Sequence, residues 1–296
     1  YKRWKYSPQK NILILSDGKA GHFKQSLALA DMVLSLGFKV KSEVCEIRYK
    51  SERHKKMFTL TSLFFGPGLS LWYLPFCLDK NTYDKLARSP FDLVISAGAY
   101  LAAFALTVAK ENNARAIAIM KPGILDYGRF DLVIMPEHDQ PPRRKNILIT
   151  TGSLNTVNAE SIKKDFQVLS STIGQISGWD TSAKPKVGLL IGGDSKNYKL
   201  MPDMMAFLCR QLAKVLEELD GYLFLTTSRR TPKDSVDILK SSFKDNPRCK
   251  LFVDAAENNP KNTVGGIFYL SDVVIVSGES ISMVSEAAAS GKYVVV

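Results

Sequence analysis

Short apolar runs rich in valine and isoleucine recur along this chain, and a segment with helical periodicity follows most of them. The runs are residues 11–15, 38–47, 91–96, 116–120, 131–136 and 146–150 in the first half, and 186–191, 222–227, 250–253, 272–277 and 293–296 in the second. Strands that are buried on both faces of a parallel sheet read as continuous apolar runs, with crossover helices between them. The pattern therefore predicts an α/β chain built on parallel sheets.

The chain has 296 residues, which exceeds what one hydrophobic core usually serves. Between Ser170 and Pro185 the periodicity is weak, and glycine, serine and proline interrupt it. We therefore expect two Rossmann-like domains, residues 1–172 and 183–296, whose strand ends face a central cleft. The last run, 293–296, has no helix after it, so we expect the second domain to be incomplete at its C-terminal end.

The 40 lysines and arginines outnumber the 29 aspartates and glutamates, which gives a formal net charge of +11 and favours anionic partners. No zinc-finger spacing and no aromatic-basic RNA-binding motif is present, so we expect no nucleic-acid partner. The four widely spaced cysteines indicate reduced thiols and a cytosolic compartment. With three histidines in the chain, no multi-histidine site can form, and we expect no metal.

The first candidate site is the turn at residues 16–22, directly after the first predicted strand. Glycines at a strand-to-helix junction let the backbone approach an anion, so Gly18, Lys19 and Gly21 are candidate anion or acceptor ligands. Asp17 and His22 on the same turn are candidate catalytic residues, with the histidine as general base. The alternative is a tight structural turn.

A second histidine, His138, lies at the end of another predicted strand and is also a candidate general base. A purely structural role is the alternative. No nucleophile elbow is present, which argues against a serine hydrolase.

The second candidate site is the turn at residues 276–283, where a strand end, a glycine and a helix start follow one another. Backbone N–H groups and hydroxyls at a helix N-terminus suit a phosphate group, and a carboxylate further along the helix suits ribose hydroxyls. The candidate donor-binding residues here are Gly278, Glu279, Ser280, Ser282, Met283 and Glu286. Alternatively, Ser280 only caps the helix and both carboxylates are solvated.

The third candidate site is the loop at residues 226–232, again directly after a strand. Ser228, Arg229 and Arg230 suit bidentate recognition of phosphate. Gly192 and Gly193 follow a neighbouring strand in the same way. Solvated surface arginines are the alternative.

Residues 57–78, from Met57 to Leu78, carry no charged side chain and many aromatic and aliphatic ones. The segment is long enough to span a bilayer, but glycine and proline at 66–68 and Pro75 interrupt it. Five basic residues lie just upstream, between 48 and 56. We therefore expect a peripheral loop that enters an anionic membrane surface, with a buried helical hairpin as the alternative.

Five sequence blocks together resemble the family of the plant elongated-mitochondria fission factor, which has many bacterial members and a GT-B glycosyltransferase architecture. The blocks are residues 16–22, 150–152, 190–193, 227–232 and 280–287. The second half is also similar to the donor domains of GT-B enzymes that act on membrane lipids. That resemblance implies that Glu286 holds the donor ribose, that the turn at Gly278 to Ser282 holds its diphosphate, and that the turn at Gly18 to His22 faces the acceptor. It also implies no cofactor, with a nucleotide sugar as the substrate.

These observations lead us to expect a metal-independent glycosyltransferase that uses a nucleotide-sugar donor. Its acceptor would be lipid-linked or part of the cell envelope, reached from the cytosolic face of a membrane. The alternative is a non-enzymatic adaptor that recruits a dynamin-like GTPase. A sugar-nucleotide epimerase of the GT-B type is a third hypothesis, for which the sequence identifies no acids in the cleft.

Overall fold

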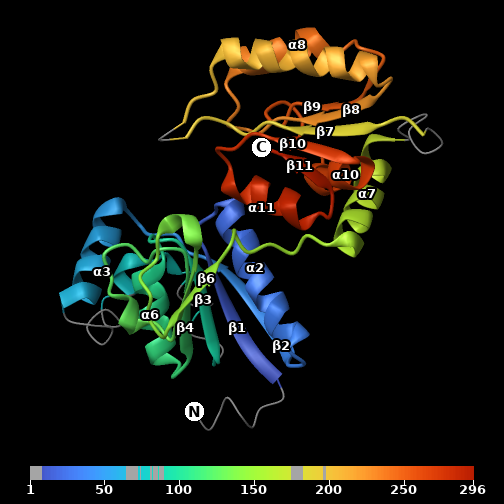
Figure 1. Cartoon of the computed structure of the whole chain (residues 1–296). Coiled ribbons are helices and arrows are strands. Elements are labelled where there is room, and N and C mark those ends of the chain that lie inside the picture. Colours follow the sequence, from blue (N-terminus) through green and yellow to red (C-terminus); the bar gives the residue numbers. More distant parts are fainter. Residues whose placement is uncertain are drawn as a thin grey trace. The chain divides into compact units, whose positions relative to one another are not determined.

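The computed structural model describes residues 9–64, 73, 75–80, 82, 86, 90–174, 183–195 and 198–296. The chain divides into two compact units, Tyr1–Asn155 and Thr156–Val296 (Figure 1). Each unit is built on one parallel sheet, so the predicted α/β class with two Rossmann-like domains is confirmed. The expected cleft between the sheets concerns how the units are placed relative to one another, and it stays a prediction.

The first unit contains a six-stranded sheet in the order β2-β1-β3-β4-β5-β6, with every pairing parallel. The strands are β1 (Gln9–Ser16), β2 (Lys39–Glu46), β3 (Leu93–Ala97), β4 (Arg115–Ile119), β5 (Leu132–Pro136) and β6 (Ile147–Thr150). Alternate residues of β1 point to opposite faces, as the period of two requires. Ile12 and Ile14 pack toward α2 (Ala20–Ser35), whereas Leu13 and Leu15 belong to the core under α3 (Glu52–Phe64) and α6 (Ala102–Glu111).

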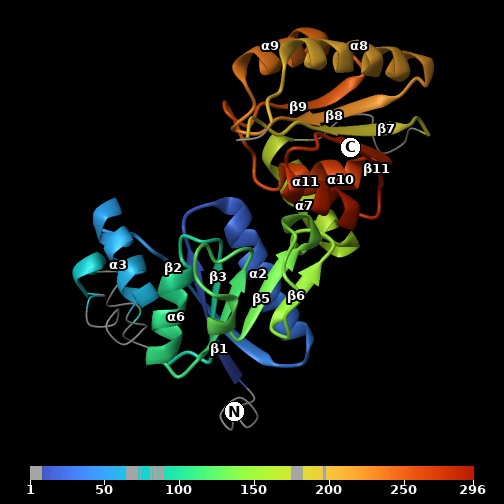
Figure 2. The same cartoon turned by 60° about the vertical axis from the view of Figure 1, so that its left-hand side comes forward.

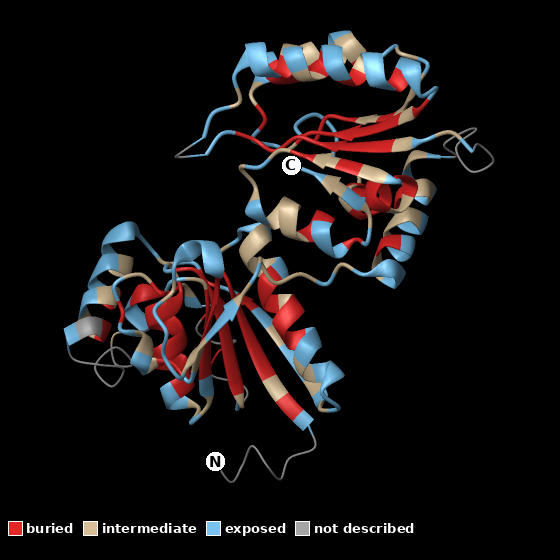
Figure 3. Cartoon of the chain, viewed as in Figure 1, coloured by how far each residue is buried: buried red, intermediate tan, exposed pale blue. Residues whose placement is uncertain are grey.

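The second unit contains a five-stranded parallel sheet in the order β11-β10-β7-β8-β9. Its strands are β7 (Lys186–Leu190), β8 (Tyr222–Thr226), β9 (Cys249–Val253), β10 (Val273–Val276) and β11 (Tyr293–Val295). The helices α8 (Pro202–Glu218) and α9 (Lys233–Phe243) cover one face. The other face packs against α7 (Ala159–Ile173), α10 (Thr263–Leu270) and α11 (Ile281–Ala289), and Figure 3 shows the buried strands between the two layers.

Each sheet has a point at which the strand order reverses. In the first sheet β1 lies between β2 and β3, and in the second β7 lies between β8 and β10. Loops on the two sides of such a point diverge, which leaves a crevice at the carboxyl ends of the strands where α/β proteins bind ligands. The turns after β1 and β3, and those after β7 and β10, are therefore the expected positions of ligand sites.

The boundary between the units lies earlier in the chain than the sequence predicted. We expected residues 1–172 to form the first domain, but α7 packs against α10 of the second unit (Figure 2). Leu169 and Ile162 of α7 are buried in the same core as Phe268. Added Cβ atoms on Gly265 and Gly266 would lie 1.9 Å from Asp165 Oδ2 and 2.4 Å from Leu169 Cδ2. The helices approach closely because α10 has glycine at both positions.

This packing predicts that Gly266→Ala destabilises the second unit. Overpacking a tight core contact costs about 1–3 kcal/mol, and we expect faster amide exchange in β7, β8 and β10 but not in β1 or β3. Hydrogen-exchange mass spectrometry measures both sheets in one sample. Gly37→Ala is the control for backbone strain without overpacking. Gly37 lies in the first unit, its φ of +87° strains alanine by about 1–2 kcal/mol, and its added Cβ would meet nothing within 4 Å, so any faster exchange should stay in the first sheet. In Gly266→Ala, exchange that rose in the first sheet alone would contradict the assignment of α7.

The predicted membrane segment, residues 57–78, lies only partly within the described structure. Residues 57–64 form the C-terminal half of α3, in which Phe58 is buried and Phe64 is 72% exposed. Residues 65–72 and 74 lie outside the described residues. Within the part of the chain that the structure describes, no helix is both long enough and apolar enough to cross a membrane.

Candidate functional site

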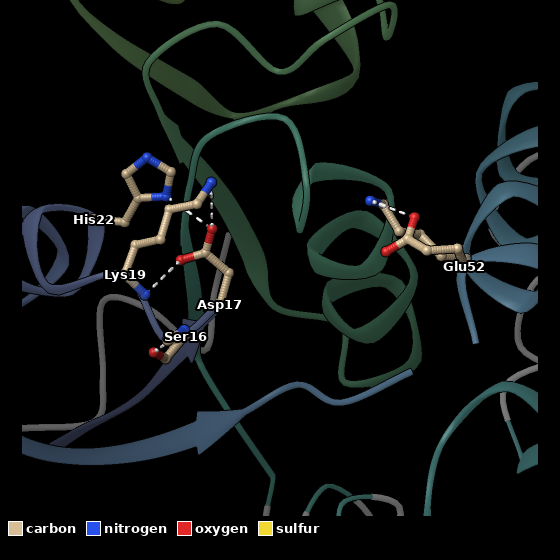
Figure 4. Close-up of polar contacts among 7 residues, drawn as sticks. Ser16, Asp17, Lys19, His22 and Glu52 are labelled. Carbon is tan, nitrogen blue, oxygen red and sulfur yellow. Dashed lines mark hydrogen bonds and ion pairs between the residues drawn. The ribbon is translucent and has the colours of Figure 1, made fainter. Parts of the chain in front are cut away.

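A histidine and a buried aspartate meet at the reversal point of the first sheet. Asp17 directly follows β1, and His22 lies in the first turn of α2. His22 Nδ1 is 3.0 Å from Asp17 Oδ2, and the two side chains are 23% and 3% exposed (Figure 4). A carboxylate oxygen accepts hydrogen bonds, so in the neutral imidazole Nδ1 carries the proton and Nε2 keeps its lone pair. No described residue hydrogen-bonds Nε2, and the pair therefore has the geometry of an oriented general base.

The imidazole of His22 lies against the backbone of the turn after β3. A Cβ added to Gly98 would lie 2.8 Å from His22 Cε1, and Gly98 has a φ of +78°. Two features therefore favour glycine at position 98: the left-handed backbone conformation, and the lack of space for a Cβ beside the His22 ring. Gly98 was not among the predicted site residues. It could have been found by the same signal as the others, since it follows the predicted strand 91–96.

The turn after β1 satisfies much of its own hydrogen bonding. The Gly18 amide donates to Ser16 Oγ at 3.2 Å, and the Lys19 amide donates to Asp17 Oδ1 at 3.2 Å. The Lys19 ammonium is 3.3 Å from Asp17 Oδ2. A carboxylate therefore already occupies this turn, and the assignment of Gly18, Lys19 and Gly21 as acceptor or anion ligands stays a prediction.

A second group of polar side chains lies on α3 and on the turn after β3. Lys55 Nζ is 3.1 Å from Glu52 Oε2 and 4.1 Å from the centroid of the Tyr100 ring. Burial, together with the carboxylates of Glu52 and Asp17, raises the pKa of Tyr100 above its ordinary value. Tyr100 is two residues beyond Gly98, so it connects this group with the His22 turn. Glu52 and Tyr100 were not identified from the sequence, and Lys55 was noted there only as one of the basic residues upstream of residue 57.

The structure places His138 away from His22. His138 lies in a short 3-10 helix, Glu137–Asp139, after β5, and its Nε2 is 3.8 Å from Asp139 Oδ1. Strands β3 and β4 separate β5 from β1, which amounts to about 14 Å at the usual strand spacing. His22 and Asp17 therefore form one constellation that does not include His138.

At the reversal point of the second sheet, Ser277, Glu279 and Gly192 form a compact cluster. Ser277 Oγ accepts a hydrogen bond from the Gly192 amide at 2.7 Å and donates to Glu279 Oε1 at 3.1 Å. A Cβ on Gly192 would lie 1.7 Å from Glu279 Oε1, so glycine makes room for this carboxylate. Glu279 Oε2 is buried and has no hydrogen-bond partner. A buried carboxylate oxygen without a partner is costly, which favours a ligand that donates a hydrogen bond here.

The loop after β8 carries two exposed arginines on a closely packed backbone. Neither the Arg229 nor the Arg230 guanidinium pairs with another described residue. The Arg230 amide donates to Ser228 Oγ at 2.9 Å. A Cβ on Gly193 would lie 2.3 Å from the carbonyl carbon and oxygen of Arg230. Gly192 and Gly193 thus contact protein atoms, and the arginines remain available for an anion.

The helix that follows β10 presents its predicted residues in different environments. Ser280 is the N-cap residue of α11, but its side chain makes no capping hydrogen bond. Met283 packs against the core that includes Val276 and Ala287, and Glu286 is buried. Beside Ser277 and Gly278, a largely apolar cavity of about 560 Å³ lies between the first turns of α8 and the ends of β7, β10 and β11.

Comparisons with known proteins agree with this architecture. A Rickettsia prowazekii protein described as uncharacterized protein RP120 is 26% identical over 95% of this chain and 81% of its own length. The Arabidopsis thaliana mitochondrial fission protein ELM1 is 25% identical over 74% of this chain, and the match spans 53% of that protein.

Two solved structures show the same fold at low identity. The UDP-GlcNAc 2-epimerase from Neisseria meningitidis, bound to UDP-GlcNAc, superimposes with a TM-score of 0.52 at 12% identity, covering 97% of this chain and 82% of the epimerase. The E. coli ADP-heptose LPS heptosyltransferase II gives a TM-score of 0.52 at 12% identity, covering 96% and 83%. Residues 20–296, nearly the whole chain, match the family described as mitochondrial fission ELM1, and the chain therefore belongs to that family.

Proposed function

We propose that this chain is a GT-B-type glycosyltransferase that binds a nucleotide sugar in its second unit and activates an acceptor hydroxyl with His22. The observation that carries the proposal is the His22–Asp17 pair at the reversal point of the first sheet. A histidine whose Nδ1 is held by a buried carboxylate has a fixed ring orientation and an Nε2 that can accept a proton.

In the proposed reaction, Nε2 of His22 accepts the proton of the acceptor hydroxyl. The acceptor oxygen forms a bond to the anomeric carbon of the sugar, and the bond between that carbon and the diphosphate oxygen breaks. The nucleoside diphosphate leaves with both electrons of that bond. Asp17 stabilises the imidazolium that forms.

The donor assignment is supported by the chemistry of the second unit. The two free arginines suit a diphosphate, and Glu279 Oε2 suits a sugar hydroxyl, because it is a buried acceptor without a donor. Glu286 is assigned to the ribose hydroxyls. Solved structures with the same fold contain UDP-GlcNAc, UDP or ADP.

A lipid-linked or envelope acceptor is part of the proposal. Its support is the basic run upstream of residue 57 together with the apolar segment 57–78, whose described part exposes Phe64. Basic residues beside aromatic ones attract anionic lipid headgroups. We assign the protein to the cytosolic face of a membrane as a peripheral protein.

The second candidate function is a non-enzymatic adaptor, and membership of the mitochondrial fission ELM1 family favours it. An adaptor would use the same scaffold without turning over a nucleotide sugar, since fold alone does not determine function. Incubation with a panel of UDP and ADP sugars separates the candidates. Glycosyl transfer supports the transferase, an epimerised sugar nucleotide supports an epimerase, and no binding supports the adaptor.

Calorimetry tests the donor site directly. Arg229→Ala or Arg230→Ala should weaken UDP or ADP binding by about ten- to a hundredfold, because each removes a charge-assisted hydrogen bond. Glu286→Gln should weaken the nucleotide but leave inorganic pyrophosphate nearly unchanged. The control is Arg248→Ala. The Arg248 guanidinium pairs with Asp220 at the amino ends of β8 and β9, away from the proposed donor site. Equal affinities for the wild type and all variants would remove the donor assignment.

A further inference from the structure

Three hydroxyl side chains connect neighbouring loops along the carboxyl edge of the second sheet. Ser277 accepts from the Gly192 amide at 2.7 Å and joins the ends of β10 and β7. Thr231 donates to the Gly192 carbonyl oxygen and joins the loop after β8 to the end of β7. Thr227 accepts from the Ala255 amide at 3.1 Å and joins the ends of β8 and β9. These hydroxyls link the carboxyl ends of the neighbouring strands β10, β7, β8 and β9.

Thr231 differs from the other two because it hydrogen-bonds both to Ser228 within the arginine-bearing turn and to the end of β7. Its Oγ1 accepts from the Ser228 amide at 2.8 Å, while its own amide donates to the Ser228 carbonyl oxygen at 3.0 Å. The side chain is buried. The turn from Ser228 to Thr231 is thus closed on itself, and the Thr231 hydroxyl ties it to β7.

A fixed turn matters for the arginines because their side chains are free. Arg229 and Arg230 are exposed, and ordering a long side chain on a ligand costs conformational entropy. If the backbone that carries them were also mobile, binding would have to order it as well. The same turn is held on its other side by the contact between Gly193 and the Arg230 carbonyl.

We infer that Thr231 is a positioning residue of the proposed donor site, holding Arg229 and Arg230 where a diphosphate can meet both. The inference rests on the proposed function. Thr231 touches no substrate itself in this role. It acts through the turn, and it therefore affects the phosphate part of the ligand more than the nucleoside part.

The test compares Thr231→Val with Thr231→Ser, using UDP and uridine as calorimetric probes. The valine variant keeps the shape of the side chain but leaves the Ser228 amide and the Gly192 carbonyl without their partner. We expect its affinity for UDP to fall about tenfold, the equivalent of one lost hydrogen bond, with uridine binding little changed. The serine variant retains the hydroxyl and should bind UDP like the wild type.

Thr227→Val is the matched control, since it breaks the link between β8 and β9 and leaves the arginine turn attached. It should retain the wild-type preference for UDP over uridine. Hydrogen exchange at the Ser228 amide should accelerate in Thr231→Val and not in Thr227→Val.

The outcomes distinguish a failure of the donor-site assignment from a failure of the positioning role of Thr231. If the wild type binds neither UDP nor ADP, the donor assignment fails and the role of Thr231 fails with it. If the wild type binds UDP and Thr231→Val binds it equally well, the donor site stands and the positioning role is wrong. An equal loss of UDP and uridine affinity would also overturn it, because that pattern indicates a general structural defect.

Discussion

Asp17→Asn should reduce sugar transfer by about two to four orders of magnitude while leaving donor affinity unchanged, since general-base catalysis contributes about 10²- to 10⁴-fold. The amide lacks the charge that stabilises the imidazolium of His22, and it can present its N–H₂ group to Nδ1 and favour the wrong tautomer. His22→Asn should show a loss of the same order. Release of UDP or ADP from a sugar nucleotide in the presence of acceptor measures turnover, and calorimetry measures donor binding.

The chain supplies a matched control in a second histidine–aspartate pair. His138 and Asp139 also follow a strand, but their side chains are 41% and 38% exposed and lie 3.8 Å apart. Asp139→Asn should therefore leave turnover within about a factor of two of wild type, as for other surface substitutions. A loss in Asp139→Asn with none in Asp17→Asn would move the catalytic assignment to His138.

Gly193→Ala should lower the affinity for UDP by a larger factor than either arginine substitution does. The new Cβ would lie 2.3 Å from backbone atoms of Arg230, which cannot rotate away as the end of a side chain can. We expect the whole arginine turn to shift, with a fall in UDP affinity above about a hundredfold and a stability loss of about 1–3 kcal/mol. Calorimetry and chemical denaturation measure the two effects separately.

Gly291→Ala controls for the stability loss. Gly291 has a φ of +75° and nothing within 4 Å of an added Cβ, so alanine there strains the backbone by about 1–2 kcal/mol without displacing a neighbour. Its UDP affinity should equal that of the wild type. If Gly193→Ala binds UDP as tightly as Gly291→Ala does, the turn tolerates the added atom and the rigid packing proposed for it is wrong.

Most of the architecture was predictable because parallel strands leave a strong local signal. Each apolar run became a strand within a few residues of its predicted ends, for example 186–191 as Lys186–Leu190 and 222–227 as Tyr222–Thr226. A strand buried on both faces must be apolar at every position, which the sequence displays directly. The position of α7 was not predictable in this way. Its partner α10 lies about ninety residues later, and no local pattern records which sheet a helix will cover.

In the candidate site too, local features were predictable from the sequence and long-range contacts were not. Strand-end glycines and hydroxyls led to the predictions of Asp17, His22 and Arg230 as site residues, because ligands of α/β proteins bind at the carboxyl ends of parallel strands. The role of each glycine was not visible, however. Gly192 accommodates Glu279 and Gly193 accommodates Arg230, and these contacts join segments that are far apart in the sequence. Gly98 was missed although it follows a predicted strand, because no charged or nucleophilic neighbour marked it.

The contiguity of the first unit bears on how the protein is made. Among the described residues, the strand pairings of its sheet lie between Gln9 and Thr150. Helix α7, which follows, packs into the core of the second unit. Domains generally fold as units during synthesis, with the N-terminal one first. The first unit can therefore fold, with its His22–Asp17 pair assembled, while the strands of the second unit are still being translated.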